Sequence, residues 1–321
     1  MNRPHSRVDV GVDVLLRAAG ISLVVLNHAT SVSQAPHFLA GLNVILVVAG
    51  FSFIRFLPQR ASASQIRGAL LAYGAGIGWP SLLMMAVSIA VFPFWRAPGR
   101  TAELSLHNVA LFPVWYPVEL VQFIVVLALV FSAPGVATTL ARRQWLTTLA
   151  LVVFTVLIRQ AETHLWRTGV LDGSGPHLML WNLAAGMMLF AATRSPRRML
   201  ASAASFLIVA ALCWVTWGPG ALRTWSTLAA AALLLGVSRV SLPFALARGL
   251  LIVSQACLFI FLLHKPAIWA FDAFTQTTDT IASFIWALSV TTAAWVICTA
   301  GSRALRRMPV GGRVAAVAPA R

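Results

Sequence analysis

Charged residues are scarce in this chain, and several other features are missing from it. Only 10% of its 321 residues are charged, and only eight are acidic, whereas soluble globular proteins carry about 25% charged residues. This scarcity excludes a soluble globule. The three cysteines lie in apolar segments without a CxxC spacing, which argues against a disulfide framework and against a metal site. There is no soluble basic face with interleaved aromatic residues, so we expect no nucleic-acid partner.

Apolar residues dominate the rest of the sequence. They make up 59% of the chain and give a mean hydropathy of +0.84. Ten apolar stretches come close to or exceed the length of about 20 residues that a helix needs to cross a bilayer. We therefore predict an all-α membrane protein, with about ten transmembrane helices in one domain over residues 1–308 and a short disordered tail over 309–321. The expected spans are 10–32, 38–57, 67–93, 113–132, 145–164, 177–193, 199–217, 222–238, 248–271 and 281–301.

The basic residues set the expected orientation. Short cytoplasmic loops retain Lys and Arg. With the N-terminus inside the cell, eighteen of the 24 basic residues fall on the inner side and six on the outer side. Both termini are therefore expected in the cytoplasm. We interpret the net charge of +16 as a topology signal and as attraction to anionic lipid headgroups.

The first span carries a polar stripe. Arg17 and His28 are separated by ten residues that are almost all apolar. At ~100° per residue, eleven steps return to nearly the same helix face, displaced by about 16 Å along the axis. Ionisable groups inside a bilayer are tolerated where they face a protein interior, a partner or a water-filled path. This stripe is therefore a candidate site, which also includes Asp13, Gly20, Asn27 and Ser31.

Polar residues in other spans form two expected sets. One set lies at the membrane depth of His28, and the other lies at the depth of Arg17. An outer set near His28 comes from spans four, five, six and nine: Trp115, Glu119, Gln122, Arg159, His164, His177, Trp181, Asn182, His264 and Lys265. An inner set lies beside Arg17: Asp13, Arg55, Arg60 and Arg67. Single members also have ordinary interpretations, among them aromatic-belt anchors, solvated surface histidines, structural ion pairs and loop arginines.

The segment DVLLRAAGISLVVLNHA, residues 13–29, resembles the first-helix pattern of the acyltransferase 3 family. Members of that family are bacterial membrane enzymes that O-acylate carbohydrates and other cell-surface or secreted molecules. Weaker similarities follow in VILVVAGFSFIRF, WYPVELVQF, MLWNLAAGMMLF and SQACLFIFLLHKPAI. The chain departs from the family pattern because Asp13 precedes Arg17 by four positions rather than three and a paired Arg-Xaa-Xaa-Arg after the second span is missing. Pro117 also interrupts the fourth span, and Phe261 stands where an aromatic hydroxyl is frequent.

The resemblance implies an enzyme of the bacterial inner membrane without a permanently bound cofactor. It would move an acyl group, with acetyl favoured, from cytoplasmic acyl-CoA to a hydroxyl of a carbohydrate or another cell-surface or secreted acceptor. His28 would act as the base or as a transient acyl carrier, and Glu119 would orient its imidazole. The donor to the developing oxyanion would be His264, Arg159 or Asn182. The expected substrate-binding residues are Asp13, Arg17, Arg55, Arg60, Arg67, Trp115, Arg159, His177 and Asn182, with the arginines on the donor phosphates.

Other functions remain open. A transporter of the ten-span drug and metabolite type has a similar length and also needs buried charges, but it predicts an internal duplication. The halves 1–160 and 161–321 do not match in their polar positions, which disfavours this alternative. A membrane scaffold, in which the stripe serves helix association, and a transferase with a lipid as acyl donor are the remaining alternatives.

Overall fold

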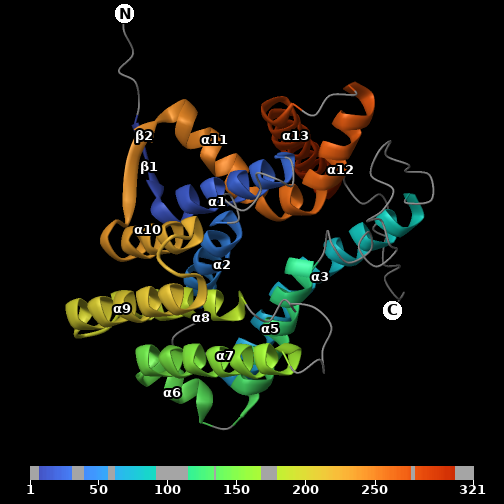
Figure 1. The fold of residues 1–321 in the computed structure, drawn as a ribbon. Coiled ribbons are helices and arrows are strands. Elements are labelled where there is room, and N and C mark those ends of the chain that lie inside the picture. The colour runs from blue at the N-terminus through green and yellow to red at the C-terminus, as the bar shows by residue number, and fades with distance from the viewer. Residues whose placement is uncertain are drawn as a thin grey trace, which may run out of the picture.

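The computed structural model describes residues 7–30, 40–56, 62–91, 115–133, 135–167, 179–275 and 279–307. This part of the chain is a set of packed helices with one small sheet (Figure 1). The helices are α1 (Val12–Ala29), α2 (Ala40–Phe53), the 3₁₀ helix η2 (Ile54–Phe56), α3 (Ala63–Val91), α5 (Trp115–Ser132), α6 (Val136–Arg142), α7 (Gln144–Arg167), α8 (Leu180–Thr193), α9 (Arg198–Trp217), α10 (Leu222–Gly236), α11 (Phe244–Gln255), α12 (Cys257–Thr275) and α13 (Thr280–Arg307).

The described helices confirm a helical membrane protein. Six of them, α1, α3, α7, α9, α12 and α13, are long and apolar enough to cross a bilayer, and α2, α5, α8, α10 and α11 are shorter apolar helices. Large apolar side chains are exposed on the outside of the bundle, including Met199 at 88% and Trp79 at 72%. Such a surface favours lipid rather than water as its surroundings. The number of crossings stays a prediction.

The expectation of an all-α chain is wrong in one place. Strand β1 (Arg7–Gly11) pairs antiparallel with β2 (Arg239–Pro243), in a register that joins Gly11 to Arg239. Both strands alternate between exposed and more buried side chains, as a half-covered strand does. The N–H of Val12 also donates to the carbonyl of Ser238 over 3.2 Å. The start of α1 therefore lies beside the end of α10.

The ninth expected span, 248–271, is two helices rather than one. Helix α11 ends at Gln255 and α12 begins at Cys257, with Ala256 between them. No proline or glycine marks this break, so local sequence did not reveal it. The two helices have different neighbours: α11 follows β2 directly and packs on α1 and β1, whereas α12 packs mainly on α13 and α1. We attribute the break to these separate packing demands.

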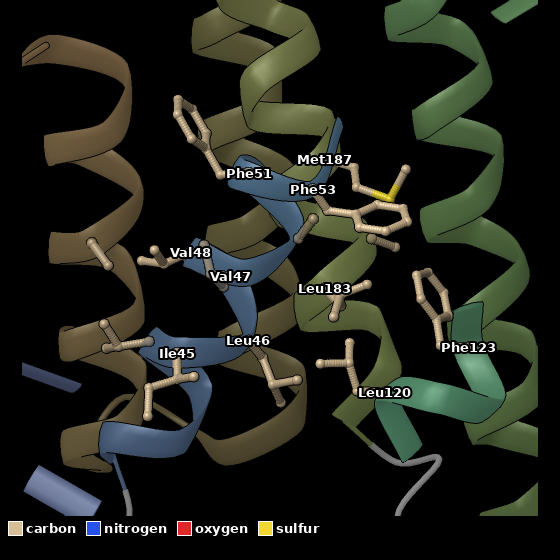
Figure 2. Close-up of a cluster of buried hydrophobic side chains, with 14 of the residues drawn as sticks. Ile45, Leu46, Val47, Val48, Phe51, Phe53, Leu120, Phe123, Leu183 and Met187 are labelled. Atoms are coloured by element: carbon tan, nitrogen blue, oxygen red, sulfur yellow. The ribbon is translucent and has the colours of Figure 1, made fainter. Parts of the chain in front are cut away.

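Glycines bring α2 into close contact with its two main neighbours. The backbones of α1 and α2 meet at Gly20 and Gly41, and those of α2 and α8 meet at Gly50 and Gly186. Helices α1 and α2 are antiparallel, whereas α2 and α8 run in the same direction through the apolar core (Figure 2). The starts of α2 and α8 therefore lie at the end of the bundle that holds the C-terminal end of α1. We call this the His28 end.

Candidate functional site

Two histidines from distant parts of the sequence face each other at the His28 end. The ring centroids of His28 on α1 and His264 on α12 are 5.0 Å apart, and their planes are tilted by 33°. His264 is buried, with 2% of its surface exposed, and His28 is partly buried. The packing of α1 against α12 thus brings together two of the three residues that were expected to be catalytic.

A backbone carbonyl fixes the tautomer of His264. Its Nδ1 lies 2.7 Å from the carbonyl oxygen of Phe261 and 3.2 Å from that of Ile260. A carbonyl oxygen can only accept a hydrogen bond, so Nδ1 carries a proton and donates it. In the neutral ring, Nε2 then has the lone pair, and this buried atom has no hydrogen-bond partner among the described residues. Neutral His264 therefore presents a proton acceptor, which does not suit the expected alternative role as an oxyanion donor.

Lys265 adds a positive charge to the histidine pair. It is the single lysine of the chain, and its ammonium lies within electrostatic range of both imidazoles. The ammonium group carries three N–H donors and no acceptor. The sequence pattern placed Lys265 at an outer helix end without giving it a role. Its position beside two imidazoles makes it a candidate donor to a negatively charged oxygen.

Arg17 lies on the same helix as His28 and points into the bundle. Its Nη2 donates to the hydroxyl of Ser52 over 2.9 Å. The guanidinium also interacts electrostatically with the side chains of Tyr73 and Cys257. Residues of α2, α3 and α12 therefore lie near this guanidinium. Sequence reasoning missed these three neighbours, although Ser52 could have been found as the only hydroxyl in the apolar run 44–54.

The other inner arginines are placed differently from Arg17. Arg55 forms an ion pair with Asp13, with 2.9 Å between Nη1 and Oδ2, and the side chain of Arg55 is half exposed. Because both belonged to the expected donor site, the carboxylate competes there with any phosphate for the guanidinium. Arg67 on α3 is exposed. Arg60 lies outside the described residues.

The remaining expected site residues do not join the histidine pair in the part of the chain that the structure describes. Arg159 on α7 donates to Thr216 of α9 over 3.0 Å, and the amide of buried Asn182 on α8 donates to the carbonyl of Met179 over 3.2 Å. His164, on α7, is exposed. Trp115 and Glu119 belong to α5, but their side chains, like the whole of His177, lie outside the described residues.

No group of three or more potential ligands among the described His, Cys, Asp and Glu residues could hold a metal ion. The site consists of an imidazole pair with a nearby ammonium at one end of α1 and the partly buried guanidinium of Arg17 about 16 Å away along the same helix.

Comparisons with family models, with curated proteins and with solved structures give no match for this chain.

Proposed function

We propose that this protein is an integral-membrane acyltransferase, similar to the acyltransferase 3 family. It takes an acyl group from cytoplasmic acyl-CoA and passes it to a hydroxyl of a carbohydrate or another cell-surface or secreted acceptor. The observation that carries the proposal is the contact of His28 with His264. His28 lies on α1, and the other half of the same helix holds Arg17. Placing two imidazoles in contact inside an apolar bundle costs free energy, and such groups in a membrane mark functional sites. Proton transfer is the function that suits imidazole best.

The proposed reaction needs a proton acceptor at the hydroxyl and a donor at the thioester. One imidazole, which we assign to His28, takes the proton as the acceptor oxygen attacks the thioester carbonyl. The new C–O bond forms, the carbonyl oxygen becomes negative, and the ammonium of Lys265 stabilises it. The C–S bond then breaks, and the CoA thiolate leaves with the proton from the imidazole. The alternative in which His28 first accepts the acyl group itself is also compatible with this placement.

Arg17 is assigned to the donor, since CoA carries phosphates that guanidinium groups bind in a planar, two-point manner. Replacing Arg17 with Gln should raise the KM for acyl-CoA by ~10-fold or more, because a hydrogen bond to a charged group contributes about 1.5–3 kcal/mol. Arg142→Gln on α6, an exposed arginine, is the matched control and should leave KM unchanged. The measurement is initial transfer rate against acyl-CoA concentration. An unchanged KM in Arg17→Gln would favour a lipid as the acyl donor.

The activity itself can be tested in two steps. Mass spectrometry of surface glycans from cells with and without this gene should show an acyl group that depends on the gene, which identifies both acceptor and acyl chain. Purified protein should then transfer labelled acyl groups from acyl-CoA to that acceptor. Uptake of a solute without any acylated product would instead support the transporter. If the protein showed neither acyl transfer nor uptake, the scaffold would be supported.

A further inference from the structure

A second polar cluster lies at the corner of the bundle formed by α7, α8, α9 and α10. The rings of Trp181 on α8 and Trp217 on α9 are 5.3 Å apart, tilted by 42°. The guanidinium of Arg223, in the first turn of α10, lies over the Trp217 ring at 5.7 Å. The three side chains therefore stack in a row, from partly buried Arg223 through Trp217 to Trp181, which is 1% exposed.

A second guanidinium reaches the same corner. Arg159 bonds the hydroxyl of Thr216, the residue next to Trp217. Neither Arg159 nor Arg223 forms an ion pair with a carboxylate among the described residues. Partly buried guanidinium groups without a counter-charge favour an anion as their partner.

Buried polar atoms at the start of α8 also lack partners. The indole N–H of Trp181 and the amide oxygen of Asn182 have no hydrogen-bond partner among the described residues, and both side chains are almost fully buried. Each such atom costs about 1–3 kcal/mol if it stays unpaired. The first turn of α8 has no side-chain cap either, so its N–H groups add to the positive character. The corner therefore offers donors for an anion together with one acceptor for a hydroxyl.

This corner is at the same end of the bundle as the histidine pair but is separate from it. The end of α10 lies beside the start of α1, through β1 and β2, so Arg223, in its first turn, is at the His28 end. Helix α8 packs on α2, α7 and α9, and α2 lies between it and α1. A ligand could therefore occupy this corner without displacing the groups assigned to acyl transfer.

We propose that Arg223, Trp217, Trp181 and Asn182 bind an anionic group with neighbouring hydroxyls, as found in a sugar phosphate, a sugar acid or a glycerophosphate headgroup. Arg223 and the indole N–H of Trp181 bind the anion, and the Trp217 ring covers an apolar face of the ligand. The amide oxygen of Asn182 accepts a hydrogen bond from a hydroxyl. This site is independent of the acyl transfer proposed above, because α2 separates α8 from α1 and the histidine pair.

The test is calorimetric titration of the whole chain in phosphatidylcholine nanodiscs with glucose 1-phosphate. Binding is expected, with glucose at least ten times weaker. Arg223→Gln should weaken binding at least tenfold, and Arg194→Gln should not, although Arg194 also stacks on an aromatic ring, that of Phe190. Trp181→Phe keeps an aromatic ring but removes the N–H, so it should also weaken the binding of glucose 1-phosphate. It replaces Arg223→Gln in the test if that variant does not fold. Binding that phosphatidylglycerol in the disc inhibits would identify a headgroup ligand, and uninhibited binding a soluble one.

Each outcome has a separate meaning for the two proposals. No binding of glucose 1-phosphate, or equal binding by Arg223→Gln and Arg194→Gln, would overturn this inference even if acyl transfer is observed. His28→Ala should bind glucose 1-phosphate as the unchanged protein does, because the histidine pair is not part of this corner. Normal binding without any acyl transfer would contradict the transferase and leave the anion site standing.

Discussion

Replacing His28 with alanine is expected to abolish acyl transfer while the protein still folds and binds acyl-CoA. Loss of a positioned general base lowers a rate by about 10²–10⁴-fold, and the same substitution would remove an acyl carrier. Binding of the donor should persist because Arg17, about 16 Å away along α1, keeps its bond to Ser52. The measurements are transfer rate and acyl-CoA affinity on the same purified sample.

A second His-to-Ala variant shows whether the effect is specific to His28 or follows from replacing any histidine of the chain. His164 is exposed on α7, so His164→Ala should transfer at the rate of the unchanged protein. If His28→Ala retained more than about a tenth of the activity, its role as base would be rejected, because a positioned base contributes more than this. Loss of both transfer and donor binding would point instead to a folding defect.

Replacing Gly186 with valine is expected to destabilise the bundle severely. A Cβ at this position would overlap the carbonyl oxygen of Val47 on α2, and a Cβ at Gly50 would overlap that of Leu183 on α8. Both obstacles are backbone atoms, which cannot rotate away as a side chain can. The two helices would have to separate along the buried surface shown in Figure 2, at a cost of about 3 kcal/mol or more. Thermal unfolding in detergent, followed by tryptophan fluorescence, measures this loss.

The control for this substitution is a helical glycine in open space. A Cβ at Gly76 on α3 would meet nothing within 4 Å, so Gly76→Ala should leave stability unchanged or raise it by up to about 1 kcal/mol, the difference in helix propensity. If Gly186→Val unfolded at the same temperature as Gly76→Ala, the close packing of α2 on α8 would be contradicted.

The sequence allowed the main axis of the site to be predicted. Eleven steps between Arg17 and His28 required one helix face, and the structure has both side chains facing other helices of the bundle rather than outward. The depth estimate also put His264 near His28. It could not reveal the carbonyl of Phe261 that fixes the His264 tautomer, because that bond depends on the rotamer of a buried ring.

The other features of the site and the fold could not be predicted, because they depend on contacts between residues that are distant in the sequence. Antiparallel packing of α1 and α2 pairs Asp13 with Arg55, which a count of inner arginines does not show. Arg159 was expected near His28 because depth was the only coordinate available, and depth does not say which helices are neighbours. In the structure α7 packs on α8 and α6, and Arg159 reaches Thr216 on α9. The pairing of β1 with β2 joins opposite ends of the sequence, so neither short strand predicts its partner.

The most direct test of the transferase is a sidedness measurement in sealed vesicles that contain the protein in one orientation. Labelled acyl-CoA is placed on the side of the N-terminus and the identified acceptor on the opposite side. We expect labelled acceptor on the far side, formed only with intact His28. Acylation only when donor and acceptor share one side, or undiminished acylation in His28→Ala, would contradict a site that joins Arg17 to the histidine pair across the bundle.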